Sequence, residues 1–108
     1  MDIKHIAEHQ FPYEVLKSDR IVIVDFWAPW CAPCRAMEPI LISIANRFPR
    51  EVQIIKVNID DEDRLAAGNR VMSIPTILIF KNGNVVDNFV GSVTELMISN
   101  AINKQLAK

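Results

Sequence analysis

The sequence predicts an α/β fold with a central mixed β-sheet of about five strands, flanked by about four helices on both faces. Two observations support this prediction. Short apolar segments rich in β-branched residues alternate with segments in which apolar residues recur every three or four positions, which indicates alternating strands and helices. An Asn-Gly turn between the last two strand-like segments predicts an antiparallel hairpin, which makes the sheet mixed.

Composition sets limits on domain number and on partners. The 108 residues are enough for one core, and no repeat, low-complexity tract or Gly/Ser-rich linker interrupts them, so we expect residues 1–108 to form a single domain. Lys plus Arg number 12 and Asp plus Glu number 13, and this balance gives no support to binding of nucleic acid or an anionic membrane. Neither a signal peptide nor a run of transmembrane length is visible, so we expect a cytoplasmic protein. We also expect it to be a monomer.

The first elements lead to the strand expected at the centre of the sheet. Residues 3–6 are a candidate short strand, and residues 11–17 are a candidate short helix in which Pro12 suits the first turn. Residues 21–27 form a β-branched and aromatic run, which is typical of a strand buried on both faces. We therefore expect residues 21–27 to lie in the interior of the sheet.

An amphipathic helix is predicted to follow the second cysteine. From Cys34 to Phe48 the apolar residues recur every three or four positions, and the pattern ends near Pro49. Pro39 lies inside this helix, where it removes one backbone hydrogen bond and conflicts sterically with the preceding turn. We therefore expect a kink at Pro39.

The remaining strands complete the sheet. Residues 52–59 are predicted to form a second buried strand, residues 61–69 a short helix and residues 76–81 a third strand. The Asn-Gly-Asn segment at residues 82–84 tolerates positive φ, so we expect residues 76–81 to form a hairpin with residues 85–90.

A final helix is expected after Gly91. Residues 92–95 match a capping box, with Ser92 as the N-cap and Glu95 three positions later. Apolar residues then recur at helical spacing at Leu96, Ile98, Ala101, Ile102 and Leu106. To the core we assign Phe26, Met37, Phe48, Phe80 and Leu96.

The only two cysteines lie three positions apart, between a predicted strand and a predicted helix. At such a junction one sulfur is near the helix N-terminus, where unpaired N–H groups and the helix dipole favour the thiolate, the form that attacks disulfides. We assign Cys31 as the nucleophile, because solvent access and the dipole coincide there. Cys34 continues the buried stripe of the helix, and we assign it as the resolving cysteine, which forms an intramolecular disulfide with Cys31.

Two other interpretations of the cysteine pair are weaker. A buried and inert pair does not explain the position at a helix N-terminus with Trp and Pro beside it. A structural zinc site would need His5 and His9 as partners, but an apolar strand separates the two pairs and no second Cys-x-x-Cys occurs. We expect neither a metal nor a bound cofactor.

One acidic residue interrupts the central apolar run. An ionised carboxylate is costly to bury, so we expect burial of Asp25 to raise its pKa. A group that accepts a proton near neutral pH would be useful beside Cys34.

These residues together resemble the thioredoxin family across the length of the chain. The matching segments, in family order, are residues 25–34, Pro39, Lys56, residues 74–76, 81–83 and 90–91. The resemblance implies the thioredoxin fold and a redox-active Cys31–Cys34 disulfide. It also implies a protein-disulfide reductase that acts as an electron carrier for cytosolic proteins.

The resemblance implies roles for residues around the cysteines. Asp25 would assist deprotonation of Cys34, through a water molecule, with Lys56 on the neighbouring strand as its charge partner. The Ile74–Pro75 peptide would be cis and would pack against the disulfide, which would turn the backbone of Ser73 and Ile74 toward the cysteines for hydrogen bonds to an extended substrate. The substrate-binding rim would consist of Trp30, Ala32, Pro33, Ser73, Ile74, Val90 and Gly91.

Partners follow from the same resemblance. An NADPH-dependent flavin thioredoxin reductase would reset the disulfide, and substrates would be disulfide-containing proteins such as peroxiredoxins, methionine sulfoxide reductase or ribonucleotide reductase. Ala32 stands where most thioredoxins have Gly, and Asn69 where many have an aromatic residue, so potential and partner range can differ. Two alternatives remain open: a redox-independent binding subunit or chaperone that uses the same surface, and an oxidase or isomerase.

Overall fold

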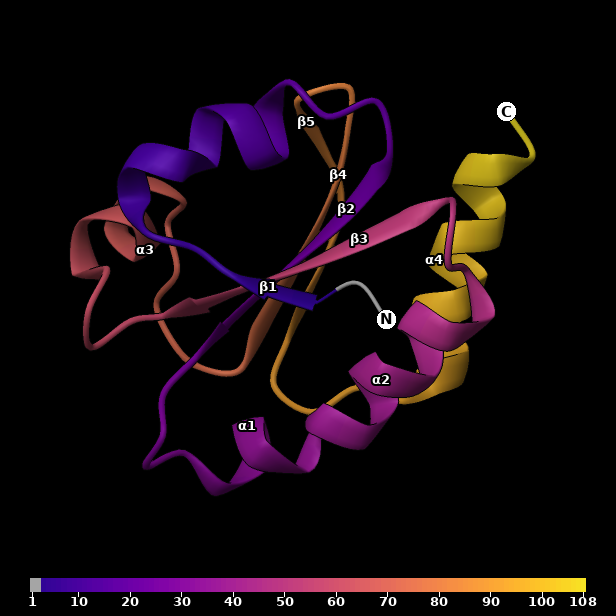
Figure 1. Ribbon diagram of the computed structural model, residues 1–108. Coiled ribbons are helices and arrows are strands. Elements are labelled where there is room, and N and C mark those ends of the chain that lie inside the picture. The colour runs from indigo at the N-terminus through magenta and orange to yellow at the C-terminus, as the bar shows by residue number, and fades with distance from the viewer. Residues whose placement is uncertain (1–2) are drawn as a thin grey trace.

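Five strands form one mixed β-sheet in the computed structural model, which describes residues 3–108 (Figure 1). The strands are β1 (Ile3–His5), β2 (Ile21–Trp27), β3 (Val52–Asn58), β4 (Thr76–Lys81) and β5 (Asn84–Val90). Their order across the sheet is β1-β3-β2-β4-β5. The first three are parallel, whereas β4 is antiparallel to both β2 and β5, so the predicted mixed sheet and its hairpin are confirmed.

Helices cover both faces of this sheet (Figure 1). They are a 3-10 helix η1 (Glu8–Gln10), a π-helix η2 (Pro12–Leu16), and the α-helices α1 (Ala32–Ala36), α2 (Glu38–Arg47), α3 (Asp63–Gly68) and α4 (Glu95–Leu106). The α2 and α4 helices pack on one face, and η2 and α3 pack on the other. The 3-10 helix η1 was not predicted from the sequence, because it is a single turn with no buried residue and hence no apolar periodicity.

The central strand β2 separates two apolar layers. Ile21 and Ile23 point to the layer under α2 and α4, whereas Val22, Val24 and Phe26 point to the layer under η2 and α3. Both layers are buried because β2 is paired on both edges, with β3 and with β4. The alternation also places the side chain of Asp25 on the face that α2 covers.

The helix predicted from Cys34 to Phe48 consists of two helices. α1 ends at Ala36, Met37 is the N-cap of α2, and Pro39 lies in the first turn of α2. An uninterrupted helix would require an N–H at Pro39, whereas the first turn of a new helix leaves that position unpaired in any case. The predicted kink is therefore confirmed, in the form of a break.

The start of α4 differs from the prediction. Thr94 is the N-cap, and its hydroxyl accepts a hydrogen bond of 3.1 Å from the Met97 N–H. The expected capping box at Ser92 is wrong, because Glu95 is the first residue of α4 and its carboxylate turns toward α2 instead. The core assignment of Leu96 is also wrong: this side chain is 67% exposed. It lies two positions before Ile98, which is on the opposite side of a helix with 3.6 residues per turn.

The hairpin turn between β4 and β5 requires a glycine at position 83. Asn82 and Gly83 both have positive φ, of 53° and 80°, as the Asn-Gly pair predicts. A Cβ added at Gly83 would lie 2.9 Å from the backbone oxygen of Leu16, so the turn also packs too closely against η2 for a side chain.

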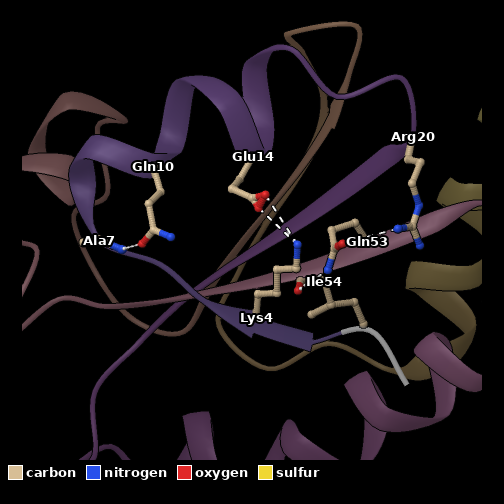
Figure 2. Close-up of polar contacts among 7 residues, drawn as sticks. All are labelled: Lys4, Ala7, Gln10, Glu14, Arg20, Gln53 and Ile54. Atoms are coloured by element: carbon tan, nitrogen blue, oxygen red, sulfur yellow. Dashed lines mark hydrogen bonds and ion pairs between the residues drawn. The ribbon is translucent and has the colours of Figure 1, made fainter.

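Polar contacts attach the N-terminal segment to the sheet (Figure 2). The Lys4 ammonium of β1 pairs with the Glu14 carboxylate of η2 at 3.2 Å. Gln53, a buried polar residue in β3, accepts a hydrogen bond from the Arg20 guanidinium at 3.3 Å and donates to the Ile54 carbonyl at 3.2 Å. The short edge strand β1 therefore has side-chain support beyond its ladder with β3.

No helix within residues 3–108 has the length and apolar character to span a bilayer.

Candidate active site

The two cysteines are joined by a disulfide at the start of α1. Their Cα atoms are 5.2 Å apart. Cys31 is the N-cap of α1, and its Sγ accepts a hydrogen bond of 3.2 Å from the Cys34 N–H. The sulfur therefore faces the unpaired N–H groups of a helix N-terminus, where negative charge is stabilised.

Cys34 is buried as predicted, whereas Cys31 is more buried than its expected solvent access implies. Cys31 is 6% exposed and Cys34 is 1% exposed, so Cys31 is the outer residue of the pair by a small margin. They pack with Ala28 in a small apolar cluster, to which Ile74 contributes from the loop before β4. Access to the Cys31 sulfur is therefore narrow, because neighbouring apolar side chains cover most of it.

The loop before β4 holds Ile74 against the cysteines. The Ile74–Pro75 peptide is cis, as the resemblance implied. The Thr76 hydroxyl donates to the Ser73 carbonyl at 2.7 Å, and the Gly91 N–H donates to the Pro75 carbonyl at 2.8 Å. The first bond closes the loop at the start of β4, and the second joins it to Gly91, directly after β5.

The predicted rim residues differ in exposure. Trp30 is 66% exposed, and its indole N–H donates to the Asp60 carboxylate at 3.1 Å, which orients the ring at the surface. Val90 is also largely exposed, whereas Ile74 is half-buried. Exposed positions are also found at Ala32, Pro33 and Ser73, and Gly91 is half-buried. The rim therefore presents exposed apolar side chains, Trp30 and Val90, near the disulfide.

Asp25 is fully buried on the face of β2 that α2 covers. Burial raises the pKa of its carboxyl from the ordinary 3.8 to about 7; the Lys56 ammonium opposes this rise and the Glu38 carboxylate adds to it. The carboxyl oxygens form no hydrogen bond with other residues of the described chain, 3–108. The raised pKa expected from the apolar run is therefore found, and burial is its main cause.

Lys56 has a different direct partner from the one expected. It lies opposite Asp25 in the β2–β3 register and is buried, but its ammonium forms an ion pair with the Glu38 carboxylate at the start of α2. The same ammonium lies 4.5 Å from the centre of the Trp27 ring. The charge of Lys56 lowers the pKa of Asp25, although Asp25 is not the ion-pair partner of Lys56.

Glu38 was not among the site residues predicted from the sequence. A buried lysine needs an acidic partner, and Asp25 was the acid in the neighbouring strand. The available signal was that Glu38 directly precedes Pro39, so it lies in the first turn of a helix that restarts over the sheet. Spacing along the chain does not show which of the two acids, Asp25 or Glu38, forms the ion pair with Lys56.

The two histidines considered as zinc ligands have neighbours other than the cysteines. The His5 ring packs edge-on against Trp27, with ring centres 5.9 Å apart. His9 belongs to η1 and is exposed. Within residues 3–108, no group of three or more His, Cys, Asp or Glu side chains is arranged to hold a metal ion.

Comparison with known proteins gives consistent relatives over nearly the whole chain. The family model described as Thioredoxin matches residues 2–104. A thioredoxin of Porphyra purpurea is 37% identical over 99% of this chain and 100% of its own length. Thioredoxin 1 of Synechococcus elongatus is 42% identical over 94% of both chains, and a thioredoxin of Haemophilus influenzae is 40% identical over 97% of this chain and 98% of its own.

Matches of this extent, together with the Cys31–Cys34 disulfide at the start of α1, show more than a shared fold. Members of the matched family are protein-disulfide reductases, which generally work with a thioredoxin reductase and with disulfide-containing proteins. The predicted thioredoxin fold, with its five-stranded mixed sheet and four α-helices, is confirmed. The chain therefore belongs to the thioredoxin family and is a thiol-disulfide oxidoreductase.

Proposed function

We propose that this protein reduces disulfides of cytosolic proteins by dithiol–disulfide exchange, with Cys31 as the attacking and Cys34 as the resolving cysteine. The observation that supports this assignment is the hydrogen bond from the Cys34 N–H to the Cys31 sulfur at the N-terminus of α1. That bond and the helix dipole stabilise a thiolate on Cys31 relative to its thiol. The greater burial of Cys34 fits a cysteine that reacts only with Cys31.

The reaction has two exchange steps. The Cys31 thiolate attacks one sulfur of the substrate disulfide and forms a mixed disulfide, while the other substrate sulfur leaves as a thiolate and takes up a proton. Cys34 loses its proton and attacks the Cys31 sulfur, which releases the second substrate thiolate and forms the Cys31–Cys34 disulfide. Two electrons have then passed from the protein to the substrate, and a reductase must return them.

Asp25 is the group that we assign to accept the Cys34 proton, through a water molecule. Its burial on the face covered by α2, and a pKa of about 7, suit a group that gains and loses a proton near neutral pH. Lys56 supports this site through its charge. Replacement Asp25→Asn is expected to slow exchange and leave the fold intact, and unchanged exchange rates from about pH 6 to 9 would overturn the assignment.

The rim around the disulfide is the proposed substrate-docking surface. Trp30, Pro33, Ile74 and Val90 offer apolar contacts around Cys31, and the backbone of Ser73 and Ile74 offers hydrogen bonds to an extended peptide. We expect broad specificity, because a shallow surface selects few features of a partner. Ala32 adds a methyl group beside the attacking sulfur, where it can alter docking or the redox balance.

We assign the chain to the cytoplasm, as one domain over residues 1–108 that acts as a monomer. Its reductant would be an NADPH-dependent flavin thioredoxin reductase. Peroxiredoxins, methionine sulfoxide reductase and ribonucleotide reductase are the proposed classes of substrate protein.

The test is turnover of a disulfide-bonded protein substrate with NADPH and a thioredoxin reductase. Cys31→Ser should be inactive, and Cys34→Ser should accumulate a mixed disulfide because the resolving attack is lost. If both variants support the cellular function, the chain is instead a redox-independent binding subunit. A reduction potential near that of oxidases would assign it as an oxidase or isomerase.

A further inference from the structure

Glu38, the first residue of α2, is linked to the buried part of the active site by its ion pair with Lys56. The side chain of Glu38 is 43% exposed, whereas that of Lys56 is 6% exposed, and the two form an ion pair. Lys56 lies opposite Asp25 in the β2–β3 register. The partly exposed carboxylate of Glu38 therefore forms an ion pair with the buried Lys56 ammonium, which is the neighbour of the buried Asp25 carboxyl.

We propose that Glu38 is a positioning residue, which controls proton exchange at Asp25 by engaging the Lys56 ammonium. This inference rests on the role proposed above for Asp25 as the acceptor of the Cys34 proton. Glu38 itself touches neither the substrate nor the cysteines in this arrangement; it acts through Lys56.

The physical reason is charge compensation. An ammonium paired with a carboxylate produces a weaker field at a third group than a lone ammonium does, because the two fields partly cancel. Without Glu38, the buried Lys56 ammonium would need another anion, and ionised Asp25 is its neighbour. The negative charge of Glu38 also acts directly against ionisation of Asp25. Both effects keep the Asp25 carboxyl ready to exchange a proton near neutral pH.

The pair is accessible to water from one side. Together with His5, Trp27 and Arg35, it lines a surface cleft of about 420 Å³. Lys56 contacts the Trp27 ring in the wall of this cleft, and His5 packs on the same ring. Glu38 can therefore gain or lose its partner without unfolding of the core.

Apart from Glu38 and Lys56, the surroundings of Asp25 in the oxidised protein include an apolar neighbour, the disulfide and one histidine. Across β4 its neighbour in register is Ile77, which is apolar. The two cysteines of the α1 junction are joined as a disulfide and do not titrate in that state. Charged groups that face this region are Lys56 from β3, Glu38 from α2, Arg35 from α1 and the titratable His5 from β1. The titration of Asp25 in the oxidised form therefore reports the effect of the Glu38–Lys56 pair without a contribution from the cysteine thiols.

A purely structural role for Glu38 makes a different prediction. An acidic residue in the first turn of α2 favours the helix through its dipole, whatever happens at Asp25. That role changes stability, but it does not change the pH at which Asp25 titrates. The test must therefore measure the proton on Asp25.

The experiment follows the Asp25 carboxyl by ¹³C NMR across a pH series of the oxidised full-length protein. Glu38→Gln should lower the midpoint of the Asp25 titration by on the order of one pH unit, because Lys56 becomes its ion partner. Glu38→Asp keeps the carboxylate and should restore a midpoint close to that of the wild type. The matched control is Glu95→Gln, which removes another ion pair of α2 but not one at Asp25, and it should leave the midpoint unchanged.

An Asp25 midpoint in Glu38→Gln that equals or exceeds that of the wild type would overturn the inference. The pH profile of substrate reduction is measured on the same variants, and it should move to lower pH with the NMR midpoint. If the midpoint moves and the rate profile does not, Glu38 still controls Asp25, but Asp25 is not the proton acceptor for exchange. The two proposals therefore fail separately.

Discussion

Two polar clusters attach opposite ends of α2 to the rest of the molecule, and they differ in burial. The buried charge cluster consists of Glu38, Lys56 and Asp25. The α2–α4 clamp consists of Glu95, which accepts hydrogen bonds from the Ser43 hydroxyl at 2.8 Å and from the Arg47 guanidinium at 3.0 Å. Both clusters join two elements through a carboxylate.

The electrostatic outcomes are opposite. Burial without a hydrogen bond to residues 3–108 raises the pKa of Asp25 to about 7. The hydrogen bonds from Ser43 and then Arg47 hold the pKa of Glu95 below its usual range. The comparison shows that a partly exposed and hydrogen-bonded carboxylate supports the fold, whereas a buried one without such bonds destabilises the fold in its charged form and remains able to exchange a proton.

The largest expected effect comes from removing the ionisable group of the buried charge cluster. Folded Asp25 holds its proton more tightly than the unfolded chain does, so the free energy of unfolding falls as pH rises from 3.8 to about 7 and then levels off. From pH 5 to 8 this loss is about 2–3 kcal/mol. Asp25→Asn removes it, so urea denaturation of the oxidised protein should show a flatter pH dependence than the wild type. The same pH dependence in both proteins would contradict the comparison.

The next effect comes from removing the cation of the buried charge cluster. Lys56 lowers the pKa of Asp25, so Lys56→Met should raise the Asp25 midpoint further, by on the order of one pH unit. NMR titration of the oxidised protein measures the midpoint. Lys4→Met is the control, because Lys4 pairs with Glu14 at the surface of η2. A downward movement in Lys56→Met would contradict the assignment of Lys56 as the charge that lowers the pKa of Asp25.

The N-cap beside the α2–α4 clamp should affect stability alone. Thr94→Ala removes the hydroxyl that accepts from the Met97 N–H, and this should cost about 1 kcal/mol of unfolding free energy. Thr94→Ser keeps the hydroxyl and should retain most of the stability. Urea denaturation at pH 7 gives the difference. The pH profile of disulfide exchange should remain that of the wild type, and a displaced profile would show that α4 is coupled to Asp25.

The smallest effect is expected in the α2–α4 clamp itself. A lowered pKa means that ionised Glu95 contributes stability above its unfolded pKa, and that this contribution is lost as pH falls through the folded pKa. Glu95→Gln should therefore lower the Tm slightly at pH 7, and the difference should shrink as pH falls through the lowered pKa of Glu95, where the wild-type carboxyl takes up a proton. Added salt should reduce the difference at pH 7, since the ion pair with Arg47 is half-exposed. A larger loss at low pH than at neutral pH would contradict this account.

Strong local patterns predicted most of the fold. The β-branched run of β2, the Asn-Gly turn and the helical stripe from Cys34 each specify which side chains must be buried, so the elements were placed within one or two residues of their observed ends. The one-turn η1 and the N-cap at Thr94 were missed, because neither depends on an apolar pattern. Leu96 was misassigned because an apolar side chain is not obliged to be buried.

Prediction of the candidate site was uneven for a related reason. The Cys31–Cys34 spacing and the carboxyl within an apolar strand are local features, and the structure shows both as expected, as a disulfide and as a buried acid. The partner of Lys56 depends on where α2 crosses β3. The sequence pattern suggested a partner in the neighbouring strand, β2, whereas the partner lies in α2.

By itself the sequence determined the order of the elements, the central position of β2, and the disulfide chemistry of residues 31–34, because these depend on spacing and on residue type. Only the tertiary structure decided that Glu38, and not Asp25, is the ion partner of Lys56, that Cys31 is nearly covered, and that Glu95 joins α2 to α4. The physical reason is that periodicity specifies the face on which a side chain lies. Which charges meet between two elements is decided by the angle and offset at which those elements pack.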